Sequence, residues 1–98
     1  MALSVFNLDD LLADPLTLRI FELIAVRRRL RFEELAKLLG KDVAYQDMSE
    51  RLKQLVQARL LAVASAPIAD FDIYYVTANG LYTDRQLRRR QQIPLYRA

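Results

Sequence analysis

Two clusters of arginine stand out among the residues that could bind a ligand. They are Arg27, Arg28, Arg29 and Arg31, and then Arg85 with Arg88, Arg89 and Arg90. Guanidinium groups make charge-assisted hydrogen bonds to phosphate, so both clusters could contact the backbone of a nucleic acid. Cations also stabilise the last turn of a helix, so the alternative is that both clusters are solvated helix ends. Charge alone favours neither interpretation.

The residues that most enzymes need are missing. The 98-residue sequence holds no Cys and no His, which excludes thiolate or imidazole zinc ligands and Cys or His nucleophiles. There is no glycine-rich phosphate loop. The carboxylate pairs Asp9–Asp10 and Glu33–Glu34 lie at expected helix starts, where the helix dipole explains them. We therefore expect no enzyme activity, no cofactor and no bound metal.

Length and composition predict one globular domain over residues 1–98. The sequence is 53% hydrophobic and 28% charged, with a net charge of +3. Positive charge concentrates in residues 19–59 and 81–98. The first residues carry no basic segment typical of a signal peptide, and no apolar run is long enough to span a membrane. We expect a cytoplasmic protein without membrane contact.

Three helices are expected in the first 59 residues, after a short one that Asn7 could cap. Asp14 and Pro15 are typical of a helix start, and the helix would end with Arg27–Arg29 in its last turn. The second runs from Phe32 to Leu39, and Gly40 ends it. The third is expected over about 47–59, because Asp47 and Glu50 have the spacing of a capping box, although it could begin near Val43.

The remaining sequence changes its hydrophobic period. Alternation at Leu61, Val63 and Ser65, and again from Phe71 to Thr77, predicts a β-hairpin. Thr77 can cap a last helix that runs through the second arginine cluster to a break at Pro94. The expected fold class is therefore α+β and mostly helical.

The order of these elements and several motifs resemble winged-helix transcription regulators of the arsenical-repressor and multiple-antibiotic-resistance (ArsR/MarR-like) types. The resemblance covers roughly residues 14–82. The motifs that carry it are Asp14-Pro15 before Leu18-Arg19-Ile20, the segment 31–40, the segment 48–55, Leu60-Leu61 and the segment 75–80. It implies a winged helix-turn-helix with a three-helix core, a β-hairpin wing and a C-terminal helix.

The resemblance also implies a function and a binding face. In this family the third helix lies in the major groove of double-stranded DNA, and the face opposite its core stripe reads the bases. Here that face holds Gln46, Ser49, Glu50, Lys53 and Gln57. The alternative is that these are ordinary solvated residues of an amphipathic helix. The family usually forms dimers, which implies a homodimer through the N-terminal segment or the last helix. The alternative is that the apolar residues of these segments pack on the core of their own domain.

Some features depart from the family pattern. Asp47 and Glu50 bring negative charge to the third helix, and the expected wing tip, residues 65–72, carries Asp70 and Asp72 but no Lys or Arg. Arg59 stands where the family usually has Gly. If the domain binds DNA, the two arginine clusters should supply much of the non-specific affinity. The alternative function is a winged-helix module that binds protein and not DNA.

Overall fold

The order of helices and strands is that expected for a winged helix, with one strand added. The computed structural model describes residues 8–68 and 71–97, and the side chains of these as far as Arg90. Its elements are α1 (Leu8–Ala13), α2 (Pro15–Arg27), β1 (Arg29–Arg31), α3 (Phe32–Leu39), α4 (Tyr45–Gln57), β2 (Leu61–Ala64), β3 (Ile73–Val76) and α5 (Ala78–Arg97).

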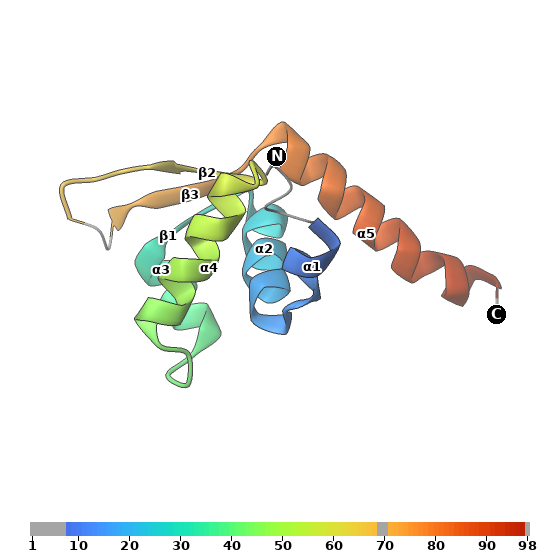
Figure 1. Cartoon of the computed structure of the whole chain (residues 1–98), viewed down its shortest axis with the longest axis horizontal. Helices are drawn as coiled ribbons and strands as arrows, with labels where there is room; N and C mark the ends of the chain where they lie inside the picture. The colour runs from blue at the N-terminus through green and yellow to red at the C-terminus, as the bar shows by residue number, and fades with distance from the viewer. Residues whose placement is uncertain (1–7, 69–70, 98) are drawn as a thin grey trace, which may run out of the picture.

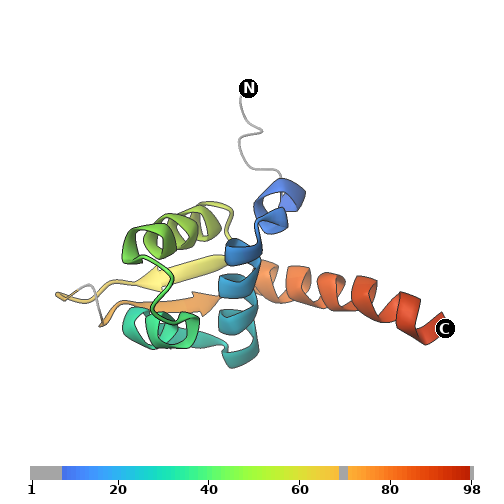
Figure 2. The ribbon, with the colours of Figure 1, turned by 90° about the horizontal axis from the view of Figure 1, so that it is seen from below.

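The strands form one antiparallel sheet in the order β1-β3-β2. β3 lies in the centre, with Arg29 opposite Tyr75 on one side and Leu61 opposite Val76 on the other. Figure 1 shows the β2–β3 hairpin and α5 extending from opposite sides of the helical body. In Figure 2, α4 lies beside β2 and α3 lies beside β1, at opposite edges of the sheet.

The core lies between α2, α4 and the sheet. Side chains at the helical spacing expected from the sequence are almost inaccessible to solvent; they are Ile20, Phe21, Ile24, Leu35, Met48, Leu52 and Leu55. Leu30, Leu60 and Leu61 add to the core from the sheet and its approach. Burying a large apolar side chain contributes about 1.5–3 kcal/mol, so this stripe is what fixes the face that α4 presents to solvent.

The start of α2 is confirmed, and its end is not where the sequence indicated. The Asp14 carboxylate accepts hydrogen bonds from the Thr17 backbone N–H at 2.9 Å and the Thr17 hydroxyl at 2.7 Å, with Pro15 in the first turn. Of the three arginines expected in the last turn, Arg27 lies there, whereas Arg28 and Arg29 lie beyond the helix. Arg28 has a φ of +75°, which ends the helix, and its side chain donates to the Ala25 carbonyl at 2.9 Å. The next residues pair with β3 because that satisfies their backbone groups.

The prediction for α3 is confirmed at both bounds, and the capping box predicted for α4 is wrong. α4 begins at Tyr45, after an extended Ala44 whose carbonyl accepts from the Met48 N–H at 3.1 Å. Asp47 therefore lies within the first turn, where its negative charge interacts favourably with the helix dipole. The Tyr45 ring packs edge-on against Phe32 of α3, with centroids 5.5 Å apart, at this first residue of α4.

The predicted hairpin is confirmed as β2 and β3. Within β3 the side chains that pack against the core are those of Tyr74 and Val76. Burial, and to a smaller extent the charge of Asp72, raises the pKa of the Tyr74 hydroxyl. The alternate residues Ile73 and Tyr75 consequently lie on the outer face of the sheet.

The cap of α5 is confirmed, and its predicted end is wrong. The Thr77 hydroxyl accepts from the Gly80 N–H at 3.0 Å. Gly80 lies so close to the Leu60 carbonyl and the Val76 side chain that a Cβ at this position would collide with both. The helix continues through Pro94 to Arg97, because a proline removes only one helical hydrogen bond and can be accommodated with a local bend. The predicted cap at Asn7 lies outside the described residues.

Candidate nucleic-acid interface

α4 has one buried face and one polar face. Met48, Leu52 and Leu55 are buried against α2 and β2. The five residues that the family resemblance indicated are all exposed; they are Gln46, Ser49, Glu50, Lys53 and Gln57. Their spacing of three or four residues places them in one stripe along the helix. The structure therefore brings together the candidate residues of the third helix.

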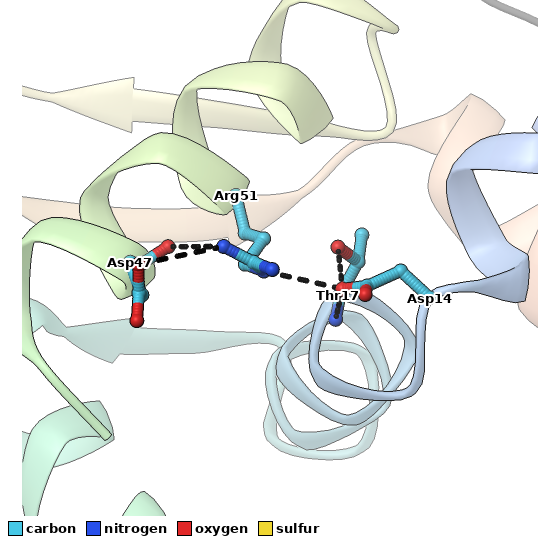
Figure 3. A network of polar contacts seen from close by, with 4 residues as sticks. All are labelled: Asp14, Thr17, Asp47 and Arg51. Atoms are coloured by element: carbon cyan, nitrogen blue, oxygen red, sulfur yellow. Dashed lines mark hydrogen bonds and ion pairs between the residues drawn. The ribbon is translucent and has the colours of Figure 1, made fainter.

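Arg51 holds α4 in place against the start of α2. Its Nε atom donates to Asp14 Oδ2 at 3.1 Å, and its Nη1 lies 3.4 Å from the Asp47 carbonyl and 3.9 Å from Asp47 Oδ1. Figure 3 shows this guanidinium between the two acids, with Thr17 beside the Asp14 carboxylate. Hydrogen bonds from Thr17 and then from Arg51 lower the pKa of Asp14, so its carboxylate stays ionised beside the guanidinium. The network adds a polar contact to the apolar packing that sets the orientation of α4.

The sequence analysis missed this positioning role of Arg51. The Asp47–Arg51 spacing of four residues is a visible sign of a helical ion pair. The contact with Asp14 joins residues 37 positions apart and leaves no local sign.

A second feature that the sequence analysis missed lies at the turn between α3 and α4. A hollow of about 560 Å³ there is lined by Lys37, Lys41 and Tyr45, among others. Both lysines and Tyr45 are exposed. They add positive charge and a hydroxyl donor next to the first turn of α4.

Three arginines from the two clusters come together between α2 and α5. Arg28, Arg85 and Arg88 line a shared hollow of about 360 Å³ between the end of α2 and the first half of α5. Within it, Arg88 donates from Nε to the largely buried Asp84 carboxylate at 2.9 Å. Arg89 and Arg90 are exposed further along α5.

The remainder of the first cluster lies at the edge of the sheet. Arg27, Arg29 and Arg31 surround a different hollow, of about 470 Å³, with Glu34 and Ile73. These arginines belong to the end of α2 and to β1, whereas α4 packs beside β2. The structure therefore does not bring them to the polar stripe of α4.

Asp72, an acidic residue of the wing, forms structural hydrogen bonds. The Asp72 carboxylate accepts from the Ala66 N–H at 2.7 Å, and the Asp72 carbonyl accepts from the Phe32 N–H at 2.9 Å. These bonds close the hairpin and tie it to α3. Asp70, the other acid expected at the wing tip, lies outside the described residues.

Two classes of site find no support in the described part of the chain. No group of three or more His, Cys, Asp or Glu side chains there is placed to hold a metal ion. No helix there is long and apolar enough to cross a membrane.

The fold matches solved structures of transcriptional regulators. A transcriptional regulator homologue from Pyrococcus horikoshii is 16% identical, with a TM-score of 0.74 over 88% of this chain and 85% of that chain. The reduced form of the regulator YodB from B. subtilis is 21% identical, with a TM-score of 0.73 over 86% and 81%. The antimony-specific transcriptional repressor AntR is 20% identical, with a TM-score of 0.69 over 92% and 78%.

Neither the family models nor the curated proteins include a match to this chain. The structural similarities confirm the predicted fold, a mostly helical α+β winged helix. The predicted β-hairpin is part of a three-stranded sheet, because β1 pairs with β3.

Proposed function

We propose that this chain is a DNA-binding transcriptional regulator that places α4 in the major groove of a duplex. The observation that carries the proposal is the exposed polar stripe along α4, opposite a fully buried apolar face. A major groove about 12 Å wide admits one α-helix, and it displays the base edges that such a stripe can read. The similarity of the whole domain to solved structures of transcriptional regulators supports the same function.

Each residue type in the stripe has a chemical role in this function. Gln46 and Gln57 carry amides that can pair with adenine, and Ser49 can donate to or accept from a base edge. Lys53 can reach guanine or a phosphate. Glu50 can accept from the amino group of cytosine, so its charge is compatible with base recognition although it repels the backbone. Lys41, in the turn before α4, and Tyr45, the first residue of α4, can contact the flanking phosphates.

We assign the arginine clusters a long-range electrostatic role and not a role in reading bases. Arg29 and Arg31 lie at the sheet edge away from α4, and Figure 1 shows α5, with Arg88, Arg89 and Arg90, extending from the body. Arg27, Arg28 and the other arginines then attract the duplex through their summed field and not through base contacts. Such attraction is screened beyond about 8 Å at physiological salt.

The proposed partner of each chain is a second copy of it. A hollow between α1 and α5 is lined by Leu8, Leu12, Tyr82 and Leu87, among others, and the Leu8 and Tyr82 side chains are exposed. Apolar groups on these flanking helices are suited to a homodimer seam. Two copies would present two α4 helices to successive turns of DNA, about 34 Å apart. A regulator of this kind acts on DNA in the cytoplasm.

Fluorescence anisotropy with a labelled duplex of random sequence tests the proposal. We expect binding that weakens steeply between 50 and 200 mM salt, on the order of the changes that phosphate contacts produce. Lys53→Ala should weaken binding and lower the salt slope by about 0.9, the value for one lost phosphate contact. Replacing Arg88, Arg89 and Arg90 by Gln should weaken binding at low salt much more than at about 0.15 M.

Arg19→Ala is the matched control for Lys53→Ala, because Arg19 is an exposed cation on α2 outside the polar stripe. It should change duplex affinity less than Lys53→Ala does. A folded protein that fails to bind the duplex at low salt contradicts the proposal. The mixed charge of α4, with Glu50 in the stripe, would then favour the alternative function of a protein-binding module.

A further inference from the structure

The strand register builds a second surface on the outer face of the sheet. Arg29, Tyr75 and Ala62 form one row across the three strands, and Arg31, Ile73 and Ala64 form the next. Residues opposite each other in neighbouring strands project to the same face. The alternate row of Leu30, Tyr74 and Val63 projects to the other side, where Leu30 and Tyr74 join the core.

This outer face is open to solvent around its aromatic ring. Tyr75 is 42% exposed, and Arg29 and Arg31 are also exposed. On β2 the facing residues are alanines, so no bulky side chain of that strand stands beside the Tyr75 ring. An exposed aromatic ring on a sheet offers a surface for stacking to a planar group.

Positive charge borders the ring on the β1 side. Arg27, Arg29 and Arg31 surround the hollow of about 470 Å³, with Glu34 as the acid in its lining. Within the described residues, the guanidinium groups of these arginines form no ion pair, in contrast to Arg51 and Arg88. Arg29 and Arg31 lie two residues apart on one strand, which separates them by about 7 Å. The two arginines can therefore bind two anionic groups of the same ligand at once.

From this juxtaposition we propose that the outer sheet face binds single-stranded DNA, with a base stacked on Tyr75 and neighbouring phosphates at Arg29 and Arg31. The charge of the hollow is complementary to a phosphate backbone, and the ring is placed to take a base. In a duplex the faces of the bases are covered by their neighbours, so a ring in this setting suits an unpaired strand. This face lies on the sheet, with its arginines on β1, whereas the polar stripe lies on α4, which packs beside β2 (Figure 2). A site there goes beyond the proposed duplex function.

The test is fluorescence anisotropy of the full chain with labelled oligothymidylate, (dT)12, at about 0.15 M salt, where distant charges are screened. Tyr75→Ala should weaken binding about tenfold, the usual loss for one stacked base. Tyr75→Phe keeps the ring and should bind as the wild type does. Arg29→Ala/Arg31→Ala should lower the salt slope by about 1.4, since each phosphate contact on a single strand contributes about 0.7.

The control variant, Arg19→Ala/Lys53→Ala, removes the same charge away from the outer sheet face. It should bind (dT)12 as the wild type does and bind the duplex more weakly, whereas Tyr75→Ala should leave duplex binding unchanged. The experiment therefore tests the single-strand site on the sheet and the duplex site on α4 independently. The proposal is overturned if the folded wild type does not bind (dT)12, or if Tyr75→Ala binds it equally well. Equal competition by polyglutamate, or a clear preference for oligouridylate, would also overturn it.

Discussion

Asp14 links the start of one helix to the orientation of another. Its carboxylate caps α2 through Thr17 and accepts from Arg51 of α4 at 3.1 Å. The first of these roles is visible in the sequence, because an Asp-Pro pair before an apolar stripe is a local signal. The second depends on a packing that brings residues 37 positions apart together, and no local pattern predicts it.

The lowered pKa of Asp14 gives stability a dependence on pH. Because the folded protein holds this carboxylate ionised, its contribution is complete above the ordinary pKa and is lost as pH falls through the lowered one. Asp14→Asn keeps a capping oxygen and removes the charge. We expect it to cost about 0.5–1 kcal/mol at pH 7, and the difference from wild type to shrink below about pH 4.

Urea unfolding at pH 7, 5 and 3 measures that difference. Asp42→Asn, at an exposed acid in the turn before α4, is the control and should show a smaller difference at every pH. A gap for Asp14→Asn that stays constant down to pH 3 would contradict the assignment.

At the scale of elements, periodic segments were predicted best. α3 was found at both bounds and α4 on its correct face, because their apolar residues recur at helical spacing. β1 was missed because three residues carry no period, and its pairing partner β3 comes more than 40 residues later. For the same reason the positions of Arg29 and Arg31 on an open sheet face could not be predicted: they follow from register, which is a tertiary property.

The turn from α4 into β2 has a backbone conformation that its residue does not favour. Arg59 has a φ of +65°, in the left-handed region where a side chain costs about 1–2 kcal/mol. Arg59→Gly removes that cost. It also raises the conformational entropy of the unfolded chain, which offsets part of the gain in stability. We expect a net gain of about 0.5–1 kcal/mol, measured as a higher urea midpoint with an unchanged slope.

Arg59→Ala separates the backbone from the side chain. It keeps the unfavourable φ and removes the guanidinium, so it should not stabilise the protein. If Arg59→Ala were as stabilising as Arg59→Gly, removal of positive charge and not relief of strain would be the cause.

At the scale of the whole molecule, the surfaces point in different directions. The polar stripe lies on α4 beside β2, the outer sheet face includes β1, and the apolar hollow lies between α1 and α5. The sequence indicated the stripe and the flanking apolar segments, since both follow from local patterns. It could not show that the two arginine clusters meet at Arg28, Arg85 and Arg88, because that contact requires α5 to pack against the end of α2.

The apolar hollow between α1 and α5 leads to a separate prediction about the oligomeric state. Tyr82 is 61% exposed on the first half of α5 and lines the hollow with Leu8 of α1. If this face is the homodimer seam, Tyr82→Glu places a charge in an apolar contact and should convert the dimer to monomer, measured by sedimentation equilibrium. Duplex affinity should fall with it, because one α4 helix then binds without the second.

Phe71→Glu is the matched control, since Phe71 is an exposed aromatic residue beside β3, on the wing and away from α5. It should leave the oligomeric state of the wild type unchanged. Both variants should remain folded, because neither ring belongs to the core. A wild-type chain that is monomeric at tens of micromolar, or a Tyr82→Glu variant that stays dimeric, would place the seam elsewhere or remove it, and the duplex would then be bound by single domains.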